Sequence, residues 1–117
     1  MKYVLLIYQG TTPLPGSDAW KRLSETEQKK VYSDYADLNK APGITPGLPL
    51  GLPDAARTVQ VRDGIPQVRN GPYLSEGAGG YLVLDAETMD AAVALAVRIP
   101  AARLGGAVEI RPAEQYW

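Results

Sequence analysis

The sequence contains no cysteine and no histidine. Without thiols the chain can form no disulfide, and without thiolates or imidazoles it offers no ligands for zinc or a comparable soft metal. Imidazole general-base catalysis and a Ser-His-Asp triad are excluded for the same reason. Carboxylates alone can bind Mg²⁺, but no acidic cluster with suitable spacing is present, so we expect no metal and no cofactor.

The chain also lacks an excess of charge and a long apolar run. Its 12 lysines and arginines balance 13 acidic residues, which argues against nucleic acid as a partner, since phosphate binding needs a concentrated basic surface. The apolar run from Tyr3 to Tyr8 is too short to cross a bilayer or to serve as a signal peptide. We therefore expect a cytoplasmic protein without a membrane partner, forming a single domain over residues 1–117.

Phenylalanine is absent as well, whereas tyrosine occurs seven times. Tyrosine must then supply the large aromatic side chains of the core or of an interface. Most of the tyrosines are accordingly expected to be structural rather than catalytic.

The pattern of apolar residues predicts strands and two helices. A capping box at Ser24 and Glu27 opens a helix over about residues 25–39, and a second helix starts near Glu87, capped by Asp85 or Thr88, and ends at Pro100. Its apolar stripe is expected to contain Met89, Ala92, Val93, Ala96 and Val97. Strands are predicted over residues 3–8, 58–62, 65–69, 81–85 and 107–112, with Asp63-Gly64 as a type I′ hairpin turn.

Two segments rich in proline and glycine interrupt this pattern. Residues 9–20 are expected to form a loop. Residues 41–55 carry four prolines, which leave too few donors for a central strand, and we expect an irregular edge segment. Its Leu48, Leu50 and Leu52 should lie on the domain or on a partner. The order of elements predicts an α+β fold of the ferredoxin-like kind, in which both helices pack on one face of an antiparallel sheet.

Several segments together resemble the YCII-related family, whose members often carry a DGPF motif. The matching segments are "MKYVLLIY" at the start, "VQVRDG" in the hairpin, "NGPY" followed by "GGYLVLD", and "RIPAARLGGAVEIRP" near the end. The resemblance implies a ferredoxin-like fold that pairs through its sheets into a dimeric α/β barrel. It also implies a cleft between the sheet and the motif loop, and hence a homodimer that takes a small-molecule ligand.

The motif loop, residues 69–81, departs from the family pattern. Where that pattern reads roughly "DGPFAETKE", Asn70 replaces the aspartate, Tyr73 replaces the phenylalanine, and no lysine occurs between Pro72 and Tyr81. A neutral asparagine cannot act as a general base. The glycines at 77, 79 and 80 precede a strand rather than a helix, which excludes a phosphate-binding loop.

Candidate site residues remain in the loop and in the last strand. Glu76 and Tyr73 are the candidate catalytic residues, because a desolvated carboxylate and a phenolic hydroxyl can exchange protons; a solvated Glu76 is the alternative. Asn70 and Arg69 are candidate ligand-binding residues, although Asn70-Gly71-Pro72 also has the composition of a simple turn. Glu109 and Arg111 lie on one face of the last strand, where they either clamp an anionic ligand or form an ion pair at the surface or between subunits.

Three functional hypotheses follow. The first is a homodimer that binds a small anionic or aromatic ligand in a sheet-side cleft without transforming it. The second is an enzyme that uses Glu76 with Arg111 or Tyr73 in acid–base chemistry on a small organic substrate. The third is a structural or protein-interaction dimer, with residues 41–55 as its contact surface.

Overall fold

A four-stranded antiparallel sheet forms the centre of the computed structural model, which describes residues 1–75 and 77–116. The strands are β1 (Lys2–Tyr8), β2 (Ile44–Pro46), β5 (Ala78–Asp85) and β6 (Ala107–Pro112), in the spatial order β2-β5-β1-β6. With the separate β3–β4 hairpin set aside, this is the strand order of a ferredoxin-like sheet. The predicted α+β fold is confirmed.

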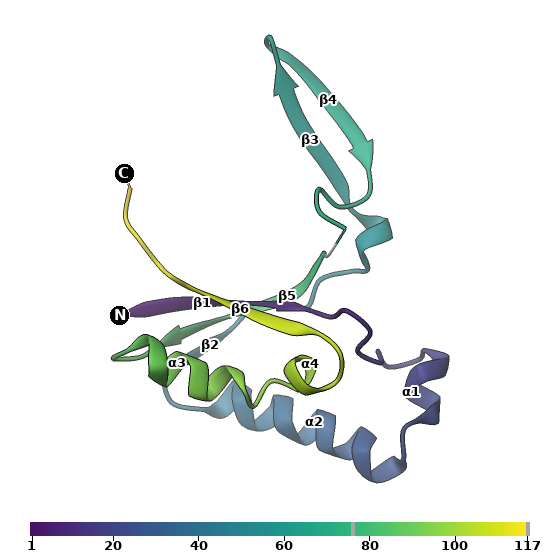
Figure 1. The fold of residues 1–117 in the computed structure, drawn as a ribbon, viewed down its shortest axis with the longest axis vertical. Helices are drawn as coiled ribbons and strands as arrows, with labels where there is room; N and C mark the ends of the chain where they lie inside the picture. Colours follow the sequence, from purple (N-terminus) through teal and green to yellow (C-terminus); the bar gives the residue numbers. More distant parts are fainter. Residues whose placement is uncertain (76, 117) are drawn as a thin grey trace.

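All the helices of the sheet domain lie on the same side of the sheet (Figure 1). Helices α2 (Glu25–Lys40), α3 (Met89–Ala96) and α4 (Pro100–Arg103) form this layer, and the short helix α1 (Asp18–Arg22) lies at its end. No helix within the described residues is long and apolar enough to span a membrane. Within the described residues, no α-helix covers the opposite face of the sheet.

The core lies between the sheet and this helix layer. Strand β1 alternates, so that Tyr3, Leu5 and Ile7 are buried while the side chains between them point to the other face. Leu5 pairs with Leu82 on β5, and the helices contribute Leu38 and further apolar side chains from the α3–α4 region. The largest fully buried side chains are Leu5, Leu38, Ile99 and Pro100.

Helix α2 matches its predicted start, and one helix was not predicted. The Ser24 hydroxyl accepts a hydrogen bond from the Glu27 amide at 3.1 Å, as expected for the N-cap. The expectation of a loop over residues 9–20 was wrong for its last part, because α1 begins at Asp18. There the Ser17 hydroxyl accepts from the Trp20 amide and caps this short helix, and the Trp20 ring packs edge-on against Tyr32.

The second predicted helix is two helices. Thr88, rather than Asp85, is the cap of α3, and its hydroxyl accepts from the Ala91 amide at 3.1 Å. Helix α3 ends at Ala96, and Pro100 begins α4 instead of ending α3, because proline fits the first turn, where its missing N–H is not needed. The predicted apolar stripe was only partly right: Ala92 and Ala96 are buried, whereas exposed side chains are found at Met89, Val93 and Val97.

The predicted hairpin forms, and it stands apart from the sheet domain. Strands β3 (Arg57–Arg62) and β4 (Ile65–Asn70) pair only with each other in the described part of the chain. Asp63 and Gly64 have φ angles of 52° and 78°, as a type I′ turn requires. The hairpin projects from one end of the sheet, on the side opposite to the helices (Figure 1).

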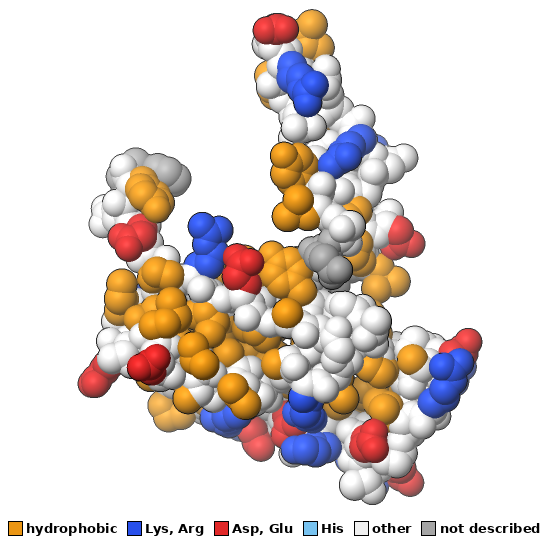
Figure 2. Space-filling view, viewed as in Figure 1, with side chains coloured by type: hydrophobic (Ala, Val, Ile, Leu, Met, Phe, Trp, Pro, Cys, Tyr) orange, Lys and Arg blue, Asp and Glu red, His pale blue; other side chains and the backbone are white. Residues whose placement is uncertain are grey.

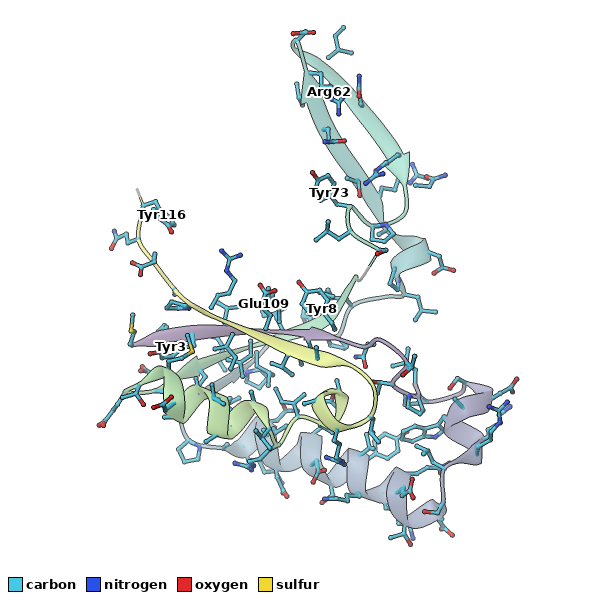
Figure 3. The ribbon with its side chains drawn as sticks, in the orientation of Figure 1. Tyr3, Tyr8, Arg62, Tyr73, Glu109 and Tyr116 are labelled. Carbon is cyan, nitrogen blue, oxygen red and sulfur yellow. The ribbon has the colours of Figure 1, made fainter. Side chains whose placement is uncertain are left out.

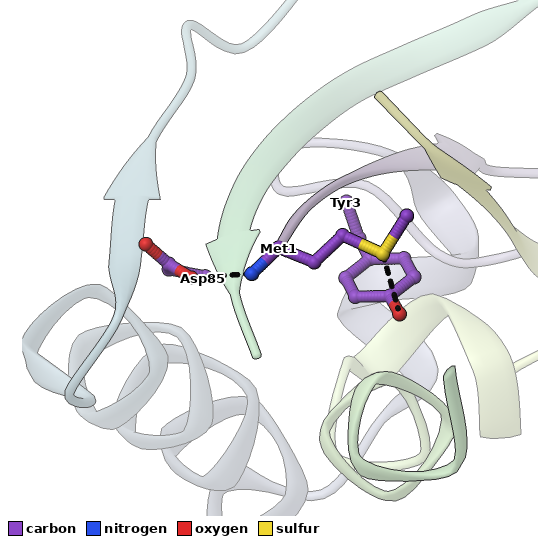
Figure 4. Close-up of polar contacts among 3 residues, drawn as sticks. All are labelled: Met1, Tyr3 and Asp85. Atoms are coloured by element: carbon purple, nitrogen blue, oxygen red, sulfur yellow. Dashed lines mark hydrogen bonds and ion pairs between the residues drawn. The ribbon is translucent and has the colours of Figure 1, made fainter. Parts of the chain in front are cut away.

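Residues 41–55 form an edge, as predicted, with more structure than an irregular segment. β2 is a three-residue edge strand that pairs with β5, and a 3₁₀ turn (Pro53–Ala55) leads into the hairpin. A short edge strand tolerates Pro46 because an edge position does not need every donor. The start of the chain is held against the end of β5, where the Met1 ammonium lies 3.2 Å from an Asp85 carboxylate oxygen (Figure 4).

Leu38→Ala should destabilise the fold strongly, because it removes a fully buried side chain from the interface between α2 and the sheet. We expect a loss of about 2–5 kcal/mol in the free energy of unfolding, measured by denaturant titration. Leu48→Ala is the matched control, since Leu48 is 72% exposed, and should change stability by less than about 0.5 kcal/mol. Equal losses in the two variants would contradict the assigned core.

Candidate functional site

The face of the sheet without helices carries two of the candidate residues. The outward side chains, which we call the open face, are apolar on the central strands and charged on β6; they comprise Val4, Leu6, Tyr8, Tyr81, Val83, Glu109 and Arg111. Tyr8 and Glu109 rise together on this face, whereas Tyr3 points toward the helices (Figure 3). Glu109 and Arg111 make no ion pair with the rest of the described chain.

Arg69 and Tyr73 contact each other rather than a cleft. The Arg69 guanidinium donates to the Tyr73 carbonyl oxygen at 3.0 Å and lies 5.7 Å from the centre of the Tyr73 ring. Asn70 ends β4 opposite Arg57, and Gly71 turns the chain with a φ angle of 95°. The Asn70-Gly71-Pro72 segment is therefore the turn that the sequence allowed, with Arg69 holding the loop behind it.

An open hollow of about 790 Å³ lies where the motif loop approaches the open face. Among the predicted residues it is lined by Glu109, beside Tyr8, Leu74 and Ser75. Tyr73, Arg69, Asn70 and Arg111 do not line it. Glu76 lies outside the described residues, so its predicted role stays a prediction.

A second, more enclosed pocket of about 320 Å³ lies on the helix side, between α2 and the sheet. The sheet contributes Ile7 and Gly80 to its walls, and α2 contributes Val31 and Tyr35. The remaining walls come from the 9–15 loop and from residues 47–49. Among the described residues that line it, none is charged and most are apolar or aromatic. The polar ones are Gln9, Thr12, Tyr32, Tyr35, Asn39 and Tyr81.

Two hydroxyl groups give this pocket its chemistry. The Thr12 hydroxyl oxygen is buried and makes no hydrogen bond with any described residue, although a buried unpaired hydroxyl costs about 1–3 kcal/mol. Burial raises the pKa of the Tyr35 hydroxyl above its ordinary value of 10.0, and the positive charge of Arg103 offsets part of that rise. Tyr35 is therefore a neutral hydrogen-bonding group at physiological pH.

The pocket continues toward the motif loop. A smaller hollow of about 190 Å³ shares Gln9, Thr12 and Gly79 with it and is also lined by Ser75 and Gly77. A β-bulge places Gly79 between the pairs Ile7–Gly80 and Tyr8–Ala78, and a Cβ atom at Gly79 would lie 2.5 Å from the Gln9 side chain. Bulges often re-aim the chain beside a site. The glycines of the loop therefore form one rim of the pocket.

Sequence reasoning missed Thr12 and Tyr35 as site residues. Thr12 was assigned to a loop, and Tyr35 was among the tyrosines expected mostly in the core or at an interface; Tyr35 does pack against the core. The available signal was the pair of proline-rich segments at 12–15 and 46–53, since apolar chain without regular structure cannot fill a core completely. No group of three or more acidic residues within the described chain is placed to hold a metal ion.

Fold and pocket together define a class: an antiparallel α+β sheet protein with one helix layer and a pocket beneath its motif loop. Comparison with protein families gives a match to the YCII-related domain over residues 1–115. The chain therefore belongs to the YCII-related family. Comparison with curated proteins finds no significant match.

Tyr35→Phe should reduce the loss of stability at alkaline pH. The pKa of Tyr35 is raised in the folded state. The contribution of its neutral hydroxyl to the free energy of unfolding is therefore fully present below about pH 10, and it is lost as the pH rises through the folded-state pKa. We expect the native protein to lose more free energy of unfolding than Tyr35→Phe between about pH 8 and about pH 11, measured by urea titration. Tyr73→Phe, at a position 63% exposed, should behave like the native protein. Parallel pH profiles for native protein and Tyr35→Phe would contradict a buried phenol.

Proposed function

We propose that the protein is a homodimer in which each chain binds one small, uncharged and largely apolar molecule. The ligand occupies the pocket between α2 and the sheet, with the motif loop at its rim. The observation that carries this proposal is the enclosed, uncharged pocket of about 320 Å³ with a buried, unpaired Thr12 hydroxyl in its wall.

Size and polarity support a small-molecule site. Ligand pockets typically have volumes of about 300–1,000 Å³ and combine apolar walls with a few polar groups that fix orientation. Here the Thr12 and Tyr35 hydroxyls and the Asn39 amide supply those groups. A rotation that brings the Thr12 hydroxyl to the pocket surface would let it pair with a ligand oxygen or N–H, and no hydrogen bond to a described residue would be broken.

The same lining favours a neutral ligand over an anion. Moving an ion from water into an apolar pocket is costly unless an opposite charge is present, and none of the described side chains that line this pocket is charged. The cationic candidate Arg111 lies on the other face of the sheet. The anionic ligand expected from Glu109 and Arg111 would therefore need the open hollow, which is less enclosed.

The homodimer is supported by the open face. An antiparallel sheet can face water on one side, but its exposed face is then usually polar, whereas Val4, Leu6 and Val83 lie on this one. Glu109 and Arg111 lie two residues apart on β6. A two-fold axis can therefore place Glu109 of each chain against Arg111 of the other chain. The catalytic roles expected for Glu76 and Tyr73 stay predictions. They require the catalytic groups to lie close together, and Glu76 lies outside the described residues.

The ligand class can be tested with a matched pair of aromatic probes. 2-Naphthol is neutral at pH 7 and 2-naphthoate is anionic, while their ring systems are the same. We expect 2-naphthol to raise the melting temperature and to give saturable shifts in the amide spectrum at Thr12, Tyr35 and Gly80. 2-Naphthoate should bind at least about tenfold more weakly, which corresponds to ~1.4 kcal/mol. Equal binding of both probes would contradict an uncharged site.

Gly80→Leu should close the pocket without unfolding the protein. Gly80 pairs with Ile7 on the helix side, and a Cβ atom there would meet nothing nearer than the Leu48 carbonyl oxygen at 3.7 Å. The leucine side chain then takes the space of the ligand, and 2-naphthol binding should fall at least about tenfold. Ala94→Leu is the control, because Ala94 is exposed on α3 and lines none of the three hollows. Undiminished binding in folded Gly80→Leu would place the ligand elsewhere.

A further inference from the structure

The β3–β4 hairpin exposes its apolar side to solvent. Val59 pairs with Val68, and Val61 pairs with Pro66, so these four side chains share one face, which we call the valine strip. Val59, Val61 and Val68 are 60%, 63% and 60% exposed. Space-filling atoms show the hairpin rising clear of the body, with hydrophobic and cationic side chains along it (Figure 2).

The polar face of the hairpin is the one that contacts its own chain. The Thr58 hydroxyl donates to the Gly71 carbonyl oxygen at 2.8 Å, and Arg69 donates to the Tyr73 carbonyl oxygen. Thr58 and Gln60 are half-buried, whereas their neighbours Val59 and Val61 are exposed. The hairpin therefore turns its polar face toward its own chain and its apolar face toward solvent.

A hairpin of this kind needs something against its apolar face. An isolated two-stranded hairpin is marginally stable in water, and three or more strands or packing against another element are needed for stability. Contiguous exposed apolar surface of this kind marks an interaction site. Within the described residues, the backbone hydrogen bond next to the hairpin lies at its base, where the Gly71 amide donates to the Ala56 carbonyl oxygen at 2.7 Å.

We propose that the valine strip docks on the open face of a second copy of this chain, so that the two copies exchange hairpins around a two-fold axis. Each hairpin then covers part of the partner's apolar Val4, Leu6 and Val83 surface. This inference rests on the homodimer of the proposed function and is independent of the ligand.

Position and shape support a second copy as the occupant. The hairpin projects on the side of the sheet where the open face lies (Figure 1), so it reaches a copy that sits on that face. Three of the four residues of the valine strip are valines, and the open face carries Val4, Leu6 and Val83, so both faces offer apolar side chains of the kind that meet where sheets pack on one another. A standard interface takes about 20–30 residues from each side, and the two six-residue strands of the hairpin with the outward residues of the sheet approach that number.

Charge supports the same occupant. The hairpin carries three arginines against one acid, Asp63, and is net positive; Arg57 shares the face of the valine strip, whereas Arg62 and Arg69 lie on the polar face. The open face carries Glu109 beside Arg111, and Glu114 lies two residues after the end of β6. Because the exchange is reciprocal, the same contact between a hairpin and an open face forms twice in the dimer.

The exposed stripe on α3, formed by Met89, Val93 and Val97, is the competing acceptor. It lies on the helix side of the sheet, whereas the hairpin projects on the opposite side. In a pair of copies that meet through their open faces, the partner's α3 is therefore behind its own sheet. The hairpin cannot reach it in that arrangement.

The first test places charges on either face of the same two strands. Val59→Asp with Val68→Asp puts two carboxylates into the valine strip, and Gln60→Asp with Gln67→Asp puts two on the polar face at the next paired position. In sedimentation velocity we expect a native dimer and an unchanged dimer for the glutamine variant. The dissociation constant of the valine variant should rise at least about tenfold, or ~1.4 kcal/mol. Equal behaviour of the two variants, or a native monomer, overturns the proposal.

The second test identifies the surface on the partner. The absence of native cysteine allows single thiols to be placed without background. A chain with Val61→Cys is mixed with a chain carrying Val83→Cys on the open face or Val93→Cys on α3, and each mixture is oxidised. We expect a mixed disulfide with Val83→Cys only. A disulfide with Val93→Cys, a Val61→Cys self-disulfide, or no cross-link in any mixture overturns the proposal.

Failure of this inference can be told from failure of the ligand site. The valine variant is also titrated with 2-naphthol, and retained amide shifts at Thr12 and Gly80 in a monomer show that the pocket is intact and that only the dimer is lost. A variant that remains dimeric and binds 2-naphthol contradicts the hairpin proposal alone.

Discussion

The structure depends on one constraint: a single layer of helices covers only one face of the four-stranded sheet. The alternation of β1 places Tyr3, Leu5 and Ile7 under that layer and leaves Val4 and Leu6 on the other side. The core, the ion pair between Arg103 and Asp34 at 2.8 Å, and the helix-side pocket all belong to the covered face. The uncovered face is the surface on which we propose that a second copy packs, and the hairpin that rises beside it carries an exposed apolar strip.

The pocket exists because small and irregular residues meet at one end of the covered face. Gly79 and Gly80 contribute no side chains to the space under α2, and the proline-rich segments on both sides cannot form a regular element that would fill it. The core aromatic nearby is Tyr35, and its hydroxyl remains neutral because burial raises its pKa. The described residues place no charged group at this point, which is why we propose a neutral ligand there.

The sequence predicted the fold well and the site only in part. Periodicity located β1, α2, the hairpin and β6, because an element with one apolar face has apolar residues at regular spacing. It could not separate α3 from α4, since Pro100 is compatible both with ending a helix and with beginning one. The pocket residues Thr12 and Tyr35 were not found, because an unpaired hydroxyl and a cavity are properties of packing between segments distant in sequence. Likewise, the outward orientation of Val59 and Val61 depends on which hairpin face the loop contacts.

A crystal structure of the chain grown with 2-naphthol tests the central claim most directly. The account predicts the naphthol ring between α2 and the sheet, against Gly80 and Tyr35, with its hydroxyl within hydrogen-bonding distance of the Thr12 oxygen. A ring bound instead beside Glu109 on the open face, with the helix-side pocket empty, would contradict it.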